Sequence, residues 1–265
     1  MTTIGFIGTG KMGGALATAV SKNSAFRLLL ANRHPEKAIA LSETTGGEVA
    51  DVSAVAERAD YIFLGVKPQM LSGLLKDIKD ILANRENPLT LVTMAAGTEI
   101  RVILDQLGKD YPVIRIMPNI PVAIGQGLIL YSCNQLVNKK TLDEFLDAMS
   151  FSGRLLRVDE RMIDAGSAVS GCGPAYAALF IEALADGGVA CGLPRNQAVE
   201  CAAQMVLGTA QYILSTGTHP GELKDAVCSP GGTTIQGVRA LEEGGFRGSV
   251  MDAVISSYEK TLSLK

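Results

Sequence analysis

Three glycines near the start of the chain have the spacing of a dinucleotide-binding turn. Gly8, Gly10 and Gly13 form a complete G-x-G-x-x-G motif, which follows an apolar run and opens a helical pattern. In this setting the first glycine permits a tight turn, the second lets a pyrophosphate approach the backbone, and the third lets helix and strand pack closely. Free N–H groups at the helix start would face the phosphates. A glycine-rich turn without a ligand is the alternative.

The end of the next strand indicates which dinucleotide is bound. An NAD site usually has Asp or Glu about 20 residues after the motif, where the carboxylate binds the ribose 2′-hydroxyl. This chain has Asn32 and Arg33 there, and no acid. Asn32 can hydrogen-bond a 2′-phosphate and Arg33 can pair with it. We therefore expect NADPH, with NADH possible; a solvated Arg33 is the alternative.

Further candidates follow three later strands. They are Val66, Lys67, Pro68 and Gln69 after the third strand, Ala95, Ala96 and Gly97 after the fourth, and Asn119 after the fifth. Carboxyl ends of strands line the ligand crevice of an open α/β sheet. Lys67 is a candidate for ribose or pyrophosphate, and Asn119 for the nicotinamide amide. Each of them alone could equally be structural.

Two glycine-rich segments stand out in the second half. Ser170–Tyr176 places Gly and Pro inside a predicted helix, where both are costly, so close packing is expected there. Asp225–Ile235 contains Ser229-Pro230-Gly231-Gly232 followed by two threonines. This pattern predicts a turn into a helix start with free N–H groups, suited to a carboxylate. A helix start without a ligand would have the same sequence.

The elements that position these residues change type near residue 159. Short apolar runs alternate with helical patterns before it, which predicts an α/β Rossmann-type domain over residues 1–158. The expected strands are Thr3–Ile7, Arg27–Ala31, Tyr61–Val66, Leu89–Met94, Val113–Ile116, Gly127–Tyr131 and Arg154–Val158, all in a parallel sheet. Residues 159–265 read as an all-helical domain, with helices near Met162–Cys191, Arg195–Ser215, Pro220–Cys228, Gly232–Glu243 and Gly248–Leu262.

One helical stretch predicts self-association. Ala175–Ala185 is apolar almost all round, so it should be buried on every side. A domain of this size can hardly bury such a helix alone. We therefore expect a homodimer, or a larger assembly of dimers, built on the helical half.

Composition excludes several classes of protein. The chain has 265 residues and a formal charge of 24 − 27 = −3, which argues against nucleic acid or an anionic membrane as the main partner. The longest apolar run, Cys172–Ile181, is too short to span a bilayer. Five scattered cysteines and no signal-like start favour a cytoplasmic protein. With two histidines, no metal site is expected.

Together these segments resemble the pyrroline-5-carboxylate reductase family over essentially the whole chain. Asp225–Ile235 looks like the family's signature, and Ser170–Tyr176, Val66-Lys67-Pro68 and Met117-Pro118-Asn119 match in order and spacing. Two positions depart from the family: Cys172 is often Ser, and Val52 is Asn in some members.

The resemblance implies a Rossmann domain, a helical dimerisation domain, and NAD(P)H-dependent reduction of a cyclic imine carboxylate to L-proline. It assigns the cofactor to Ile7, Gly8, Thr9, Gly10, Lys11, Met12, Asn32, Val66, Lys67, Pro68, Gln69, Ala95, Ala96 and Gly97. It assigns the substrate to Ser229, Gly231, Gly232, Thr233 and Thr234.

This chemistry agrees with the residues around the expected site. Ketone reduction needs an acid for the developing alkoxide, usually His or Lys, and neither occurs within Ser167–Asp186. An iminium already carries its proton, so Thr234 need only hydrogen-bond the ring nitrogen and orient it. The alternatives are reduction of a 3-hydroxy or 2-keto acid, which a helix lysine would favour, and a non-catalytic NADP-binding sensor.

Overall fold

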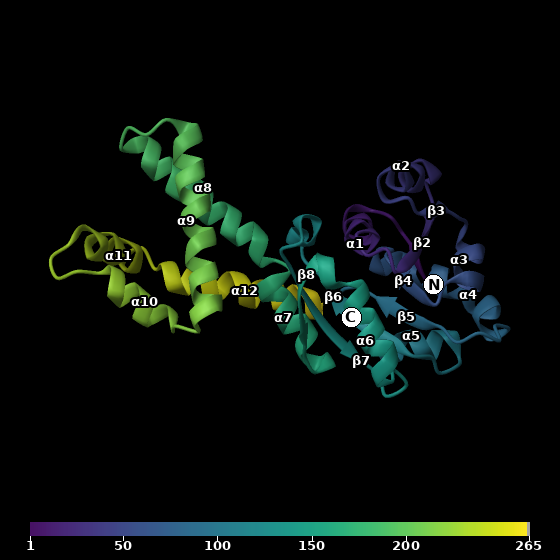
Figure 1. Ribbon diagram of the computed structural model, residues 1–265. Coiled ribbons are helices and arrows are strands. Elements are labelled where there is room, and N and C mark those ends of the chain that lie inside the picture. Colours follow the sequence, from purple (N-terminus) through teal and green to yellow (C-terminus); the bar gives the residue numbers. More distant parts are fainter. Residues whose placement is uncertain (264–265) are drawn as a thin grey trace. The chain divides into compact units, whose positions relative to one another are not determined.

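Within residues 1–263, which the computed structural model describes, eight strands form one sheet (Figure 1). Their order is β3-β2-β1-β4-β5-β6-β7-β8. Strands β1 to β3 are thus added toward one edge of the sheet and β4 to β8 toward the other, and the order reverses between β1 and β4. This topology confirms the Rossmann-type fold. The strands are β1 (Thr2–Ile7), β2 (Phe26–Ala31), β3 (Glu48–Val49), β4 (Tyr61–Leu64), β5 (Thr90–Thr93), β6 (Val113–Met117), β7 (Gly127–Cys133) and β8 (Gly153–Arg157).

The sequence predicted an entirely parallel sheet, but the sheet in the structure is mixed. The strands from β3 to β6 are parallel, whereas β7 runs antiparallel to β6 and β8 runs parallel to β7. A parallel pair needs a crossover of about a dozen residues or more. The connection from β6 to β7, residues 118–126, is shorter and holds only the short helix η1 (Ile120–Ile124), so the chain turns back.

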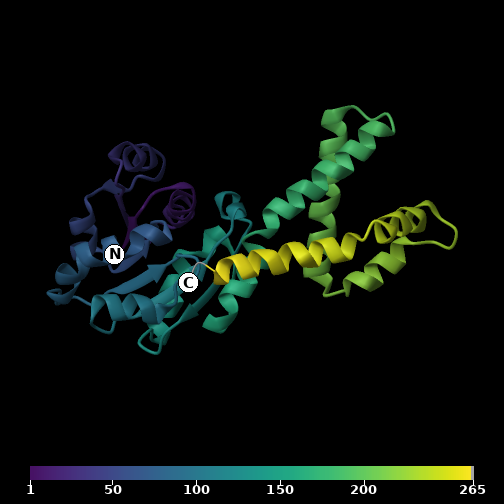
Figure 2. The same cartoon turned by 180° about the vertical axis from the view of Figure 1, so that it is seen from behind.

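Helices cover both faces of this sheet (Figures 1 and 2). One core packs α3, α4 and α5 on the side chains of Leu29, Ile62 and Leu91, and the other packs α1, α2 and α6 on those of Phe6 and Phe63. Burial on both faces explains why the strands are continuous apolar runs. The helices are α1 (Lys11–Ser21), α2 (Pro35–Thr45), α3 (Val52–Arg58), α4 (Pro68–Ala83), α5 (Ile100–Leu107) and α6 (Lys139–Ala148), with short helices η2 (Ser150–Ser152) and η3 (Glu160–Met162).

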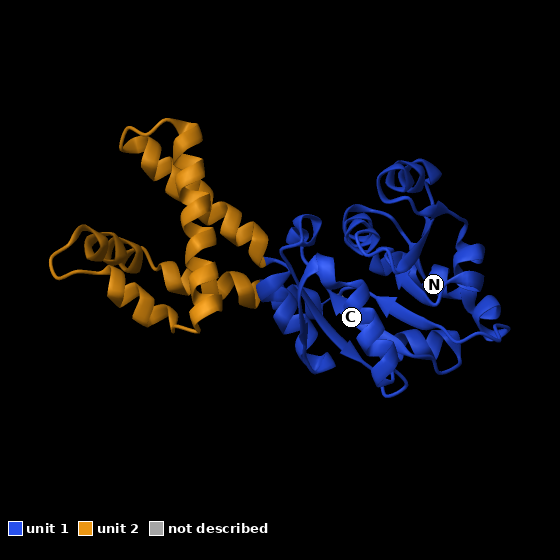
Figure 3. Ribbon diagram, in the orientation of Figure 1, with its two compact units in different colours: residues 1–172, 257–265 blue, residues 173–256 orange. Residues whose placement is uncertain are grey.

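The chain divides into two compact units, coloured separately in Figure 3. Unit 1 contains residues 1–172 and the chain from residue 257, and unit 2 contains residues 173–256. The sequence had placed the change at residue 159. The difference is α7 (Ile163–Ser170), which packs on the sheet: a Cβ at Gly166 would lie 2.4 Å from Leu130 Cδ1, and buried Asp164 pairs with Arg115 of β6.

Unit 2 consists of helices whose apolar side chains are largely uncovered. They are α8 (Gly173–Ala190), α9 (Arg195–Thr216), α10 (Pro220–Val227), α11 (Thr233–Glu243) and most of α12 (Phe246–Leu262). Among the described residues of this unit, Ala185, Ala198 and Ala202 are the only buried apolar ones. Leu179 of α8 is 67% exposed and Leu214 of α9 is 65% exposed. A hydrophobic surface of this kind needs a covering partner.

The segment Glu160–Ala190 is long and apolar enough to cross a membrane by length and composition. Its local structure is unlike that of a spanning helix. The predicted single helix over Met162–Cys191 is interrupted at Gly171 and Cys172, between α7 and α8. Its first part holds buried Asp164 against the sheet.

Candidate active site

The glycine motif forms a tight turn between β1 and α1, at the carboxyl edge of the sheet. Gly8 has φ +104°, a conformation that L side chains rarely adopt, and its N–H donates to the Ala31 carbonyl at 2.8 Å. A Cβ at Gly13 would lie 2.1 Å from the Gly8 carbonyl oxygen, and one at Gly65 would lie 2.5 Å from that oxygen. These glycines are therefore required for the turn to close against the end of β4.

Two features of this turn fit a dinucleotide phosphate group. A Cβ at Gly10 would meet no atom within 4 Å, so space remains in front of the α1 N-terminus. Gly10 caps that helix without a side-chain hydrogen bond, and the first turn has no acidic residue. Thr9 is 6% exposed, and its Oγ1 has no hydrogen-bond partner among the described residues. An oxygen-rich ligand would satisfy these donors. The neighbouring positions Ile7, Lys11 and Met12 complete the turn that the sequence assigned to the cofactor.

Asn32 braces the glycine turn from the end of β2. Its Oδ1 accepts a hydrogen bond from Thr9 N at 3.0 Å, and its Nδ2 donates to the His34 carbonyl at 3.0 Å. The side chain thus joins the two loops expected to hold the cofactor. Arg33 beside it is exposed, which leaves its guanidinium accessible to a 2′-phosphate.

The ends of β4 and β5 contribute to the same edge of the sheet. Lys67 caps α4 and is exposed, and Pro68 is the first residue of that helix; Val66 and Gln69 flank them. Ala95 is buried and its N–H donates to Thr93 Oγ1 at 3.4 Å, while Gly97 has φ +70°. The first group follows β4, the parallel neighbour of β1, and the second, which includes Ala96, follows β5, the next parallel strand. Both therefore lie near the β1–β4 switch point, where a ligand crevice is expected.

Asn119 makes contacts inside unit 1. Its Nδ2 donates to the Ser170 carbonyl at 3.0 Å, and its Oδ1 accepts from Leu128 N at 2.9 Å. The amide joins the end of β6 to the start of β7 and to the end of α7. Contact with the nicotinamide remains a prediction.

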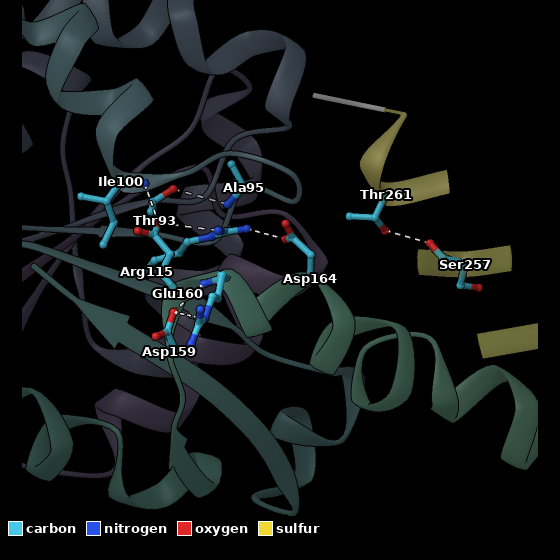
Figure 4. Close-up of polar contacts among 10 residues, drawn as sticks. Thr93, Ala95, Ile100, Arg115, Asp159, Glu160, Asp164, Ser257 and Thr261 are labelled. Atoms are coloured by element: carbon cyan, nitrogen blue, oxygen red, sulfur yellow. Dashed lines mark hydrogen bonds and ion pairs between the residues drawn. The ribbon is translucent and has the colours of Figure 1, made fainter. Parts of the chain in front are cut away.

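Sequence reasoning missed the buried charges beside this segment. Arg115 is fully buried in β6; its Nη2 lies 2.5 Å from Asp164 Oδ1 and its Nη1 lies 3.6 Å from Glu160 Oε1 (Figure 4). A detectable signal was present, because Arg115 is the one charge within the apolar run Val113–Met117. A charge in a strand buried on both faces needs a partner.

The substrate candidates form the turn between α10 and α11 in unit 2. Gly231 has φ +69°, and Gly232 N donates to the Ser229 carbonyl at 3.0 Å. Gly232 caps α11 without a side-chain hydrogen bond, and no acidic residue occupies the first turn. Thr233 and Thr234 are exposed, and within the described residues their hydroxyls make no hydrogen bond. The arrangement offers free N–H groups and two hydroxyls to an anion.

A lysine precedes this turn but is already paired. Lys224 of α10 hydrogen-bonds Asp225, and this contact raises the pKa of Lys224. It is therefore fully protonated at neutral pH and carries a permanent positive charge rather than a labile proton. The groups at this turn are suited to binding an anion, with threonine hydroxyls as weak hydrogen-bonding groups.

Two family models match the chain. One, described as "Pyrroline-5-carboxylate reductase dimerisation", matches residues 160–264, and the other, "NADP oxidoreductase coenzyme F420-dependent", matches residues 3–97. The first begins within three residues of α7, close to the boundary that the sequence predicted.

Known proteins similar to the chain cover its whole length. Pyrroline-5-carboxylate reductase of Escherichia coli (strain K12) is 40% identical over 98% of this chain and 97% of that protein. The enzyme of that name from Pisum sativum is 37% identical over 99% and 96%. Among solved structures, Plasmodium falciparum pyrroline carboxylate reductase with NADP bound has a TM-score of 0.88 and 29% identity, covering 99% of this chain and 97% of that one.

Proposed function

The chain belongs to the pyrroline-5-carboxylate reductase family, and we propose that it reduces L-1-pyrroline-5-carboxylate to L-proline, the final step of proline biosynthesis. The single observation that carries this proposal is full-length similarity, at 40% identity, to the Escherichia coli pyrroline-5-carboxylate reductase. The turn at Ser229–Thr234, which is suited to an anion, supports it. An NADP-binding Rossmann unit and a substrate turn on a separate helical unit are the parts that such a reductase needs.

NADPH fits the residues of unit 1. The space in front of Gly10 and the unpartnered Thr9 Oγ1 suit a pyrophosphate, and exposed Arg33 suits a 2′-phosphate. When bound, the cofactor supplies the hydride. The chain itself contributes binding and orientation: the glycine turn holds the phosphates, and the segments at Val66–Gln69 and Ala95–Gly97 line the crevice. Use of NADH remains possible because no residue at the end of β2 repels a 2′-hydroxyl.

The substrate's two functional groups match the α11 turn. Free N–H groups at the start of α11 would bind the carboxylate, together with Ser229, Gly231, Gly232 and Thr233. Thr234 Oγ1 would accept a hydrogen bond from the protonated ring nitrogen and fix the ring's orientation. A protonated imine needs no strong acid, and the product amine is basic enough to remain protonated. Thr234 is therefore assigned positioning rather than proton transfer.

We further propose a homodimer, or an assembly of dimers, in the cytoplasm. The apolar surface of α8 and α9 includes Leu179, Val199 and Leu214, which are exposed in the single chain. The family model's description as a dimerisation region supports their burial against a second copy. That burial also accounts for the apolar composition of Glu160–Ala190 without a membrane. No nucleic-acid partner is proposed, in line with the net charge of −3.

The direct test is oxidation of NADPH by the purified chain, followed with and without pyrroline-5-carboxylate. We expect turnover that depends on the imine, with L-proline as product. Turnover with a 2-keto acid but not with the imine would favour the other reductase chemistry. NADPH binding without turnover on any imine would favour a sensor.

A further inference from the structure

A buried group of charges lies beneath the cofactor edge of unit 1. We call Arg115, Glu160 and Asp164 the Arg115 cluster (Figure 4). The side chains of Arg115 and Asp164 are 1% and 4% exposed, and their closest atoms, Nη2 and Oδ1, are 2.5 Å apart. Arg115 lies opposite Thr93 in the β5–β6 register, and Thr93 is two residues before the Ala95–Gly97 segment. The cluster therefore adjoins a loop proposed to line the cofactor crevice.

The cluster connects three elements. Glu160 Oε1 lies 3.6 Å from Arg115 Nη1 and also accepts the N–H of Ile100, the first residue of α5, at 2.7 Å. Asp164 belongs to α7 and Arg115 to β6. The loop Ala95–Gly97 leads into α5, so both ends of this connection are held: Ala95 at Thr93, and Ile100 at Glu160.

The same strand holds α7 at its other end. Asn119 follows β6 and donates to the carbonyl of Ser170, the last residue of α7. Side chains from one segment, residues 115–119, thus fix the first and last turns of α7. The chain leaves α7 through Gly171 and Cys172 and enters α8, the first helix of unit 2.

Stability alone is a poor reason for this arrangement. Arg115 Nε and Nη1 are buried without a hydrogen-bond partner among the described residues, since 3.6 Å is too long for a hydrogen bond. Replacing a buried ion pair with apolar side chains of similar volume is often neutral or stabilising. What an apolar pair cannot provide is the directional, charge-assisted hydrogen bond from Arg115 Nη2 to Asp164, which fixes one helix position against the strand.

We propose that Arg115 and Asp164 are positioning residues for the reduction. Their ion pair fixes α7 against β6, and Arg115 faces Glu160, which holds Ile100 at the end of the connection that contains the Ala95–Gly97 loop. The pair thus sets the position of this loop, and with it the alignment on which hydride transfer depends. This inference rests on the proposed function. Small displacements in such a reaction are costly, because a misplacement of about 1 Å can cost roughly a hundredfold in rate. The cluster does not contact the glycine turn or Arg33 in the described residues, so the contacts proposed for the cofactor phosphates should survive its loss, and cofactor affinity should change much less than kcat.

The test compares Arg115→Met/Asp164→Leu, Arg115→Lys and a matched control, Arg85→Met. Arg85 is also partly buried, with a buried Nε that has no partner, and its Nη1 donates to the carbonyls of Ala56 and Ala59 at 2.8 Å. These carbonyls precede β4, at the opposite edge of the sheet from the cofactor crevice. Each protein is measured for thermal unfolding, NADPH affinity by fluorescence, kcat, and the deuterium isotope effect with deuterated NADPH.

We expect the double variant to fold and to bind NADPH within about threefold of wild type, while kcat falls roughly ten- to hundredfold and the isotope effect rises. Arg115→Lys should give an intermediate kcat, because it keeps the charge but an ammonium group cannot reproduce the position of the guanidinium Nη2. Arg85→Met should change unfolding only. A kcat within threefold of wild type in the folded double variant, or in Arg115→Lys if the double variant does not fold, would overturn the proposal. Absence of wild-type turnover would instead overturn the proposed function.

Discussion

Replacing Gly10 with alanine should weaken cofactor binding and leave folding almost unchanged. The backbone at Gly10 has φ −71° and ψ −168°, which alanine adopts without strain, and its new Cβ would meet no protein atom within 4 Å. The fold should therefore lose only the preference of an N-cap for glycine over alanine, about 1 kcal/mol or less. For a chain of this size that corresponds to a fall in Tm of roughly 2–4 °C at most.

Cofactor binding should fall much further in this variant. The methyl group would occupy the space in front of α1 where the pyrophosphate is expected, and it would keep the phosphate from the helix N–H groups. A hydrogen bond to a charged group contributes about 1.5–3 kcal/mol, so losing one should raise the Kd for NADPH roughly ten- to hundredfold. Fluorescence titration of NADPH on the substrate-free protein measures this directly.

Two other glycines serve as controls. Gly73, an exposed residue of α4, also has no atom within 4 Å of a built Cβ, so Gly73→Ala should stabilise the helix slightly and leave the Kd unchanged. Gly13→Ala would place its Cβ 2.1 Å from the Gly8 carbonyl oxygen and should destabilise the fold itself. If Gly10→Ala binds NADPH with wild-type affinity, the pyrophosphate does not lie at this turn and the reasoning is wrong.

Further variants test the three remaining assignments. Thr234→Ala should lower kcat/KM about ten- to hundredfold without altering NADPH affinity, and Thr234→Ser should restore most of it; a loss beyond about ten-thousandfold would indicate essential proton chemistry at Thr234. Arg33→Ala should raise the KM for NADPH roughly ten- to hundredfold while changing that for NADH little, and equal effects on both would remove Arg33 from the 2′-phosphate site. Leu179 is 67% exposed in the single chain and would be buried in the proposed dimer. Leu179→Asp should therefore prevent self-association, measured by light scattering, because burying an unpaired charge is costly; a dimer of wild-type stability would place the interface elsewhere. Phe180→Asp is less selective, since Phe180 already packs on Phe246 within the chain at 5.7 Å between ring centroids.

Periodicity predicted the long elements and missed the short ones. The sheet, the helices on both faces and the change to an all-helical second half follow from apolar runs that burial makes necessary. β3 is two exposed residues, Glu48 and Val49, so no alternating pattern could develop. α3 is seven residues long, and its clearest signal is Asp51, which caps the helix by accepting from Ala54 N at 2.7 Å.

The boundary between the two units depends on long-range contacts of α7, and the Asp164–Arg115 pair is the clearest of them. The sequence from Met162 to Cys191 has helical periodicity throughout, which favours assigning it to a single element of the second domain. Asp164, however, pairs with Arg115, 49 residues earlier in the chain, and this pairing keeps α7 with the sheet. The local sequence pattern carries no information on such a partner. It could therefore locate the change from alternating strands and helices to helices alone, but not the division between the units.

The same limit applies to polar residues at the ends of strands. Asn32 and Asn119 follow apolar runs, and from sequence each could equally be a ligand contact or a structural group. Arg115 lies within such a run, and sequence reasoning missed it. In the structure each side chain hydrogen-bonds to its own chain: Asn32 to Thr9 N and the His34 carbonyl, and Asn119 to Leu128 N and the Ser170 carbonyl. Arg115 hydrogen-bonds to Asp164. Loops at the carboxyl edge have few ladder partners, so side chains must satisfy their backbone groups before a ligand can be held in one geometry. An amide or guanidinium at this edge therefore affects a ligand chiefly by fixing the loop that touches it. Exposed Arg33 and the exposed hydroxyls of Thr233 and Thr234, which make no such contacts within residues 1–263, remain the better candidates for direct binding.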